Sequence, residues 1–242
     1  MPENGEGPVE NGRSTGCGPP DDGDAAAGGR AAGAMDTPNR PVLSEAVDEL
    51  VAAEFARSKP GTRFLFTCRF TRIMNLNMLI LRRCLQFRGE KGIYVSMDRP
   101  HSYTQYNLKK LGVAQDGLIY IDAISKLTGQ RAEESMVRFL ADGFTLPILD
   151  DLFSRAYLPE GAQRHFVKME ELSFILLDNV NVMLQYASMD KTRKVLAGLT
   201  ELVKKFTAMR TIIVFDPGSS PELYSFLKAH SDRELPVREE AL

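Results

Sequence analysis

The sequence predicts a three-layer α/β sandwich with a mostly parallel central sheet. Five short runs are apolar almost throughout, which is typical of strands buried on both faces of a parallel sheet. Segments of helical length separate most of them, and this alternation predicts right-handed strand–helix–strand crossovers. The five runs are Arg63–Cys68, Gly92–Met97, Leu118–Asp122, Ser173–Asp178 and Thr211–Asp216.

Helices are predicted where apolar residues recur at three- and four-residue steps. The first follows Ser44, a favourable N-cap, and ends near Pro60 and Gly61. The helix predicted over His101–Leu111 ends at Gly112, because glycine suits the left-handed position that follows a helix. The other predicted helices cover Ile73–Arg88 and Lys191–Met209.

Composition limits the class of protein. The chain has 242 residues, of which 43% are hydrophobic and 26% are charged, as in ordinary globular proteins. No apolar run approaches the roughly 18 residues of a membrane span, so we expect no membrane partner. Three cysteines without a CxxC pair suit a reducing compartment, which predicts a cytoplasmic protein. A net charge of −2 gives no electrostatic reason to expect nucleic acid as a partner.

Residues 1–40 differ from the rest of the chain. They contain 9 of the 19 glycines, 5 of the 13 prolines and no aromatic residue, with a net charge of −4. Such a segment buries too little apolar surface to offset its ordering entropy, which predicts a disordered acidic tail and a folded domain over 41–242. The tail is either a recruitment arm or a solvated leader. A translation start at Met35 is a further hypothesis.

Residues near 125–170 predict a helical insertion in this domain. Glu133–Ala141 and Leu146–Ala156 both have a helical pattern, and Leu158–Gly161 interrupts the chain after them. The insertion is either a lid over the carboxyl edge of the sheet or a packed pair of helices.

Acidic side chains are expected at that edge. Asp122, Asp178 and Asp216 end three of the runs, and Asp98 follows a fourth. Ligands of open parallel sheets bind beyond the carboxyl ends of the strands, and carboxylates there suit a magnesium–nucleotide site. Aspartate is also common where a chain leaves a strand, because its side chain caps the following turn.

The turn after the first strand decides between these interpretations. A phosphate-binding loop needs glycines to wrap the phosphates, and lysine to reach the terminal ones. The segment Cys68–Asn75 has neither, and Phe70 and Ile73 are bulky. Three of its side chains can still meet an anion at the helix N-terminus: Arg69, Thr71 and Arg72.

The order of these pieces resembles the RecA-type ATPase core, and most of all its KaiC-related branch, over roughly residues 42–235. The first strand and its helix resemble the Walker A unit, and Phe174–Asp178 resembles Walker B. Asp98 lies where the family has its first catalytic acid, but Arg99 follows instead of a second acid. The resemblance implies a RecA-like fold, with Asp98 and Asp178 as catalytic candidates and Asp178 as the candidate metal ligand.

The same alignment removes the phosphate-binding residues of the family. Its two glycines, its lysine and its Ser/Thr correspond to Cys68, Ile73, Met74 and Asn75. The resemblance therefore implies a non-hydrolysing regulatory or signalling protein, which binds a protein partner or assembles with its own copies. The alternative is an unconventional ATP-binding protein or ATPase with ATP and Mg²⁺ as cofactors. Asp178 would then act with candidate nucleotide contacts at Arg69, Thr71, Arg72 and Asn75.

Two further side chains allow other chemistry. His101, at a predicted helix start, is either an acid–base group of an unrelated enzyme on the same sheet or an exposed helix-terminal histidine. Cys68 is either a thiol whose pKa Arg69 lowers or a buried and inert one. A group of arginines between Arg63 and Arg88 is interpreted as a solvated face or as a phosphate contact.

Overall fold

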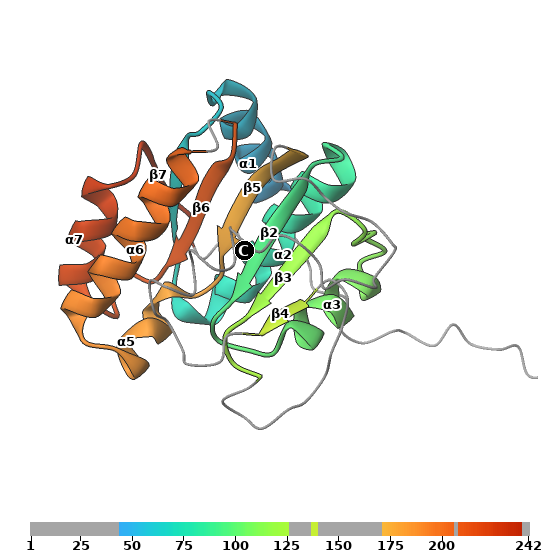
Figure 1. Ribbon diagram of the computed structural model, residues 1–242. Helices are drawn as coiled ribbons and strands as arrows, with labels where there is room; N and C mark the ends of the chain where they lie inside the picture. Colours follow the sequence, from blue (N-terminus) through green and yellow to red (C-terminus); the bar gives the residue numbers. More distant parts are fainter. Residues whose placement is uncertain (1–43, 126–136, 140–170, 206–207, 239–242) are drawn as a thin grey trace, which may run out of the picture. The chain divides into compact units, whose positions relative to one another are not determined.

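Seven strands form one parallel sheet in the computed structural model of the protein (Figure 1). Their order across the sheet is β4-β3-β2-β5-β6-β1-β7, and every pairing among them is parallel. The structure describes residues 44–125, 137–139, 171–205 and 208–238. The strands are β1 (Arg63–Thr67), β2 (Lys91–Ser96), β3 (Leu118–Asp122), β4 (Val137–Phe139), β5 (Leu172–Leu177), β6 (Arg210–Phe215) and β7 (Arg233–Pro236).

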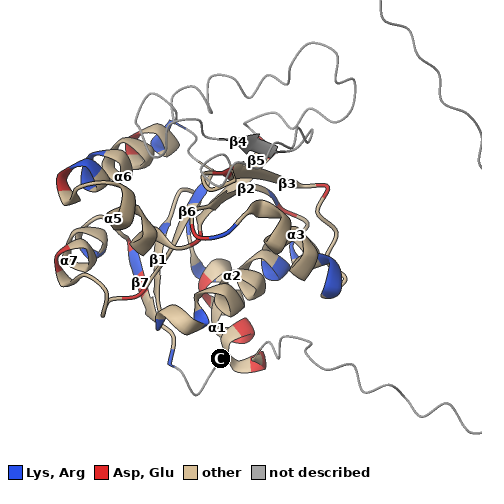
Figure 2. Ribbon diagram, turned by 90° about the horizontal axis from the view of Figure 1, so that it is seen from below, with Lys and Arg blue, Asp and Glu red and all other residues tan. Residues whose placement is uncertain are grey.

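Helices cover both faces of this sheet, so the predicted three-layer α/β architecture is confirmed. Viewed toward the ends of the strands, α1, α2 and α3 lie on one side and α6 and α7 on the other (Figure 2). The helices are α1 (Glu45–Arg57), α2 (Ile73–Arg82), α3 (His101–Lys110), α5 (Met183–Tyr186), α6 (Met189–Lys204) and α7 (Pro221–Ala229). No helix of the described segments is long and apolar enough to cross a membrane.

Two hydrophobic cores hold the layers together. In β1, Phe64 and Phe66 face the core under α1 and α2, whereas Leu65 faces the core under α6 and α7. The same alternation runs through β2, β5 and β6, and it explains why their sequences are apolar almost throughout. All five predicted strands are confirmed to within a residue or two at each end.

The helix ends follow the sequence closely. The side chains of Ser44 and Ser188 each accept a hydrogen bond from the backbone N–H three positions later, and so they cap α1 and α6. Because Ser188 is the cap, α6 begins at Met189, slightly before the predicted start. Gly112 has a φ of 70° after α3, as its predicted position requires.

The helix predicted over Ile73–Arg88 has a more detailed structure. A single 3₁₀ turn, η1 (Phe70–Arg72), leads into α2, and a π-helical turn, η2 (Arg83–Phe87), ends it. The wider π turn is followed by Gly89, whose φ of 61° lets the chain reverse toward β2.

The helix predicted over Glu133–Ala141 is wrong at Val137–Phe139, which forms β4 beside β3. The outer edge of β3 carries backbone groups that need partners, and valine and phenylalanine favour a strand. The predicted helix Leu146–Ala156, most of the predicted insertion and the tail 1–40 lie outside the described residues. The elements α7 and β7 were not predicted.

Candidate functional site

The carboxyl ends of the strands bring the predicted acidic residues to one edge of the sheet. Along that edge the strand order places Asp122 first, then Asp98 after β2, Asp178 after β5 and Asp216 after β6. The turn after β1 follows next. One strand, β6, therefore separates the turn after β1 from Asp178.

Asp178 points into the protein rather than outward. It is 1% exposed, and its Oδ1 accepts hydrogen bonds from the backbone N–H of Met97, at 2.9 Å, and of Asn179. Its Oδ2 accepts one from the hydroxyl of Tyr94 at 3.1 Å. Burial raises the pKa of Asp178 to about 7, and the nearby charge of Asp98 adds to the rise. The carboxyl group thereby fastens the end of β5 to the end of β2.

Tyr94 extends this connection to a helix. Its hydroxyl oxygen accepts a hydrogen bond from Thr104 of α3 at 3.3 Å, and both side chains are fully buried. Burial raises the pKa of Tyr94 well above its usual value, so the phenol stays protonated and donates to Asp178.

Asp122 and His101 form a second buried pair. The carboxylate accepts hydrogen bonds from the backbone N–H of His101 at 2.7 Å, from Ser125 and from Ile124, and His101 Nδ1 lies 2.6 Å from Oδ2. Burial alone would raise the pKa of Asp122, but these hydrogen bonds outweigh it and lower the pKa. His101 is 2% exposed, so the expectation of an exposed helix-terminal histidine is wrong.

The turn after β1 is closed by Asp216. Its Oδ2 accepts a hydrogen bond from the backbone N–H of Phe70 at 3.0 Å, and its Oδ1 accepts one from Gly218 at 2.9 Å. Arg72 N–H donates to the carbonyl of Arg69, which closes η1. Phe70 itself points outward and is 48% exposed, whereas Ile73 is buried at 4%.

A series of hydrogen bonds that the sequence did not predict joins the turn after β5 to the turn after β6. Ser219, after β6, donates to Asn181, and Asn181 donates to Asn179 at 3.0 Å, next to Asp178. Asn179 is 1% exposed, and its Nδ2 atom has no hydrogen-bond partner among the residues that the structure describes. The signal in the sequence was the pair of asparagines that follows Asp178.

The predicted nucleotide contacts lie in the turn after β1 and at the start of α2, and their side chains differ in exposure. Arg69 and Thr71 are exposed, whereas Arg72 and Asn75 are half-buried. Asp98 is half-exposed and forms an ion pair with Arg99 at 3.7 Å. Within the described residues, no group of three or more His, Cys, Asp or Glu side chains could hold a metal ion.

Cys68 is 5% exposed, and burial raises the pKa of its thiol to about 12, which favours the interpretation as an inert thiol.

Most arginines of the group between Arg63 and Arg88 form ion pairs within the fold. Arg63 pairs with Asp232, Arg82 and Arg83 pair with Asp48, and Arg88 pairs with Glu90.

No family model matches this chain, and no curated protein matches it in sequence. Solved structures are similar in fold. The KaiC-like protein PH0186 from the hyperthermophilic archaeon Pyrococcus horikoshii OT3 is 14% identical over 74% of each chain, with a TM-score of 0.51. The uncharacterized protein PH0321 from Pyrococcus horikoshii, in complex with an unknown peptide, is 14% identical over 78% of this chain and 82% of its own, with a TM-score of 0.55.

These similarities define the fold class. The domain has the KaiC/RecA-like α/β fold that the sequence resemblance implied. At 14% identity the similarity concerns the fold alone, and the activity has to be argued from the site.

Proposed function

We propose that this protein is a non-hydrolysing KaiC/RecA-like regulatory protein that acts by binding a partner protein. The observation that carries the proposal is the turn after β1. Its Phe70 N–H donates to Asp216, although a phosphate loop would leave such a group for the ligand.

The residue types of the turn support the same conclusion. Glycines are needed where the backbone wraps a phosphate, but Cys68 and Ile73 lie there with buried side chains. Met74 lies where a lysine would reach the terminal phosphates. A carboxylate, Asp216, already accepts the Phe70 N–H, and its negative charge would repel a triphosphate. The residues present therefore do not fit Mg·ATP.

Asp178 supports the proposal from the other side of β6. A Walker B carboxylate has to be ionised and to face the metal and its water. Here three hydrogen bonds direct the carboxyl group into the core, and a pKa of about 7 leaves it partly protonated at neutral pH. Its proposed role is to stabilise the sheet edge.

Partner binding is supported by what the turn exposes instead. An aromatic ring, Phe70, lies beside the exposed Arg69 and Thr71 at the edge where this fold class binds ligands. Aromatic and arginine side chains are enriched in the energetic centres of protein interfaces. PH0321 was solved with a peptide, which is consistent with peptide binding by a protein of this fold.

Calorimetric titration with Mg·ATP, combined with an assay of phosphate release, tests the proposal. We expect no steady release and no binding at the turn after β1. Steady release that is lost in the Asp216→Asn variant or the Arg72→Gln variant would contradict it. Light scattering at several protein concentrations then shows whether the partner is a second copy of this chain.

The alternative proposal is an unconventional ATP-binding protein. The positions of Asp98 and Asp178 at neighbouring strand ends favour it, because carboxylate oxygens at that edge are ligands that Mg²⁺ prefers. It predicts that Mg·ATP raises the melting temperature of the native chain, since a ligand that binds only the folded state stabilises it. It also predicts that Asp178→Asn abolishes this rise.

A further inference from the structure

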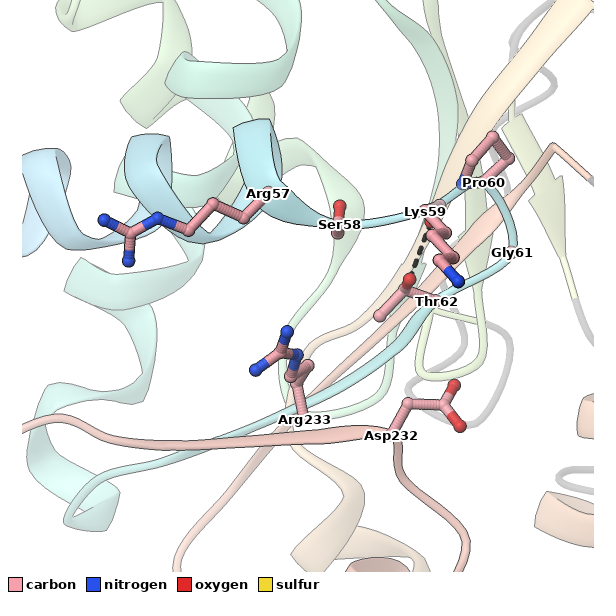
Figure 3. A pocket seen from close by; sticks show the side chains of 8 residues that line it. All are labelled: Arg57, Ser58, Lys59, Pro60, Gly61, Thr62, Asp232 and Arg233. Carbon is pink, nitrogen blue, oxygen red and sulfur yellow. Dashed lines mark hydrogen bonds between the residues drawn. The ribbon is translucent and has the colours of Figure 1, made fainter.

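Two adjoining cavities lie at the amino end of β1, at the opposite edge of the sheet from the candidate site. Figure 3 shows the first of them, which is lined by Arg57–Thr62, Asp232 and Arg233. The volumes of the two cavities are about 350 and 420 Å³, within the range of small-molecule sites. Both are lined by Pro60, Gly61 and Asp232. A ligand here would not meet the turn after β1, because the five residues of that strand span roughly 17 Å.

The residues Pro60 and Gly61, which line both cavities, belong to a tight turn. Pro60 and Gly61 occupy its central positions, and the φ of 77° at Gly61 is typical of a type II turn. The backbone N–H and the hydroxyl of Thr62 both donate to the carbonyl of Lys59, at 3.2 and 2.6 Å. The turn therefore holds its shape before any ligand binds.

The acidic residue that lines both cavities is already neutralised. Arg63 donates to Asp232 through Nε at 3.0 Å and through Nη2 at 2.7 Å, and its backbone N–H donates at 2.9 Å. The hydrogen bond from Arg63 is the largest cause of the lowered pKa of Asp232, so the carboxylate stays ionised and paired.

Four further cations line the cavities, and two of them have no acidic partner in the part of the chain that the structure describes. Arg57 lies 3.8 Å from Glu54, and Lys204 pairs with Glu201. No ion pair of the described residues involves Lys59 or Arg233, and both are exposed. In Figure 3 the side chains of Arg233 and Asp232 point in different directions, so the neighbouring carboxylate does not neutralise the guanidinium.

The end of α1 offsets only part of this positive charge. The carbonyl groups at a helix C-terminus amount to about half of a negative charge. They attract cations, which accounts for the position of Arg57 in the last turn of α1. The two unpaired cations outweigh that half charge, in a chain whose overall net charge is −2.

We infer that these cavities bind a small phosphorylated molecule, with its dianionic phosphate group near Lys59 and Arg233. Two unpaired cations match the two charges of a phosphate monoester, and lysine and arginine are common phosphate-binding residues. The second cavity has apolar surface from Val203 and Met209 for the organic part of the ligand. The inference does not depend on the proposed function, because it uses the other edge of the sheet.

Nuclear magnetic resonance titration of the full chain with inorganic phosphate, at constant ionic strength, tests the site. We expect saturable shifts at the backbone amides of Gly61, Thr62 and Arg233. The double variant K59Q/R233Q should weaken binding about tenfold, since each exposed charge contributes up to about a fivefold change in affinity. Neither side chain makes an ion pair among the described residues, so the variant should keep the melting temperature of the native chain.

The control is K109Q/K191Q, which removes the same charge from exposed lysines of α3 and α6. It should change the affinity less than twofold. An equal loss in both variants, or shifts that never saturate, would overturn the site. Phenyl phosphate should bind several times more tightly than phosphate if the second cavity accepts the organic part, and equal affinity would overturn that part of the inference.

Discussion

The turn after β1 and the turn after β5 differ in how closely their residues match those of a nucleotide site. The first has neither the glycines nor the lysine that a phosphate loop needs, and its Phe70 N–H donates to Asp216. The second has an aspartate where the sequence resemblance implies a Walker B carboxylate, but Asp178 is buried and hydrogen-bonded within the fold. A residue in the position of a catalytic group can thus have a structural role. The direction of its side chain, into the core or toward solvent, distinguishes a structural role from a catalytic one.

The substitution Asp178→Ala should have the largest effect on stability of those that test this comparison. The variant leaves the N–H groups of Met97 and Asn179 and the hydroxyl of Tyr94 without their acceptor. We expect the free energy of unfolding to fall by about 3–5 kcal/mol, measured by urea denaturation. The control Asp98→Ala, at a half-exposed position, should cost less than about 1 kcal/mol. A variant as stable as the native chain would mean that Asp178 is a free ligand, as in an active Walker B motif.

The pH dependence of Asp178→Asn is the next largest effect. Asp178 has a pKa of about 7 in the folded chain, against 3.8 without the fold, so the folded state binds an extra proton between these values. The stability that this proton gives is full below pH 3.8 and is lost as the pH rises through 7. The stability of the native chain relative to Asp178→Asn should therefore fall by about 2–4 kcal/mol between pH 4 and 8. A difference that does not change with pH would contradict the buried carboxyl group.

Asp216→Ala tests the first turn with a smaller effect. Loss of the acceptor for Phe70 and Gly218 should reduce the free energy of unfolding by about 1–2 kcal/mol. Hydrogen exchange at the Phe70 amide should become faster than in the native chain, while the amides of β2 keep their protection. Unchanged exchange at Phe70 would show that Asp216 does not close the turn.

Phe70→Ser should have the smallest effect on stability, below about 1 kcal/mol, because the ring is half-exposed. If the ring is part of a partner interface, the same variant should weaken binding at least tenfold once a partner is known. A partner that binds both chains equally would place its interface elsewhere.

The fold was predictable because most of its signals are local. Continuous apolar runs identified the five strands that end at the candidate site, and Ser44 and Gly112 marked helix ends as they do in the structure. The sequence also contains the signals of α7, a serine cap at Ser220 followed by Pro221, although this helix was not predicted. Strand β7 has no apolar run, because only Leu235 of its four residues is buried.

The candidate site was predictable in position but not in orientation. The sequence placed Asp178 at a strand end, whereas two of its three hydrogen bonds come from Tyr94 and Met97, more than 80 positions earlier. The same holds for His101, whose ring is buried against Asp122. Contacts between distant segments decide whether such a side chain faces solvent or the core, and spacing alone does not contain that information.

The position of β1 between β6 and β7 has a consequence for synthesis of the chain. Arg63 at the start of β1 binds Asp232, 169 positions later, and both strands that flank β1 come from the last part of the sequence. While the ribosome is still producing that part, Phe64, Leu65 and Phe66 have no sheet partner. Completion of the domain is therefore a late and slow event, and until then the nascent chain depends on protection of these residues from aggregation.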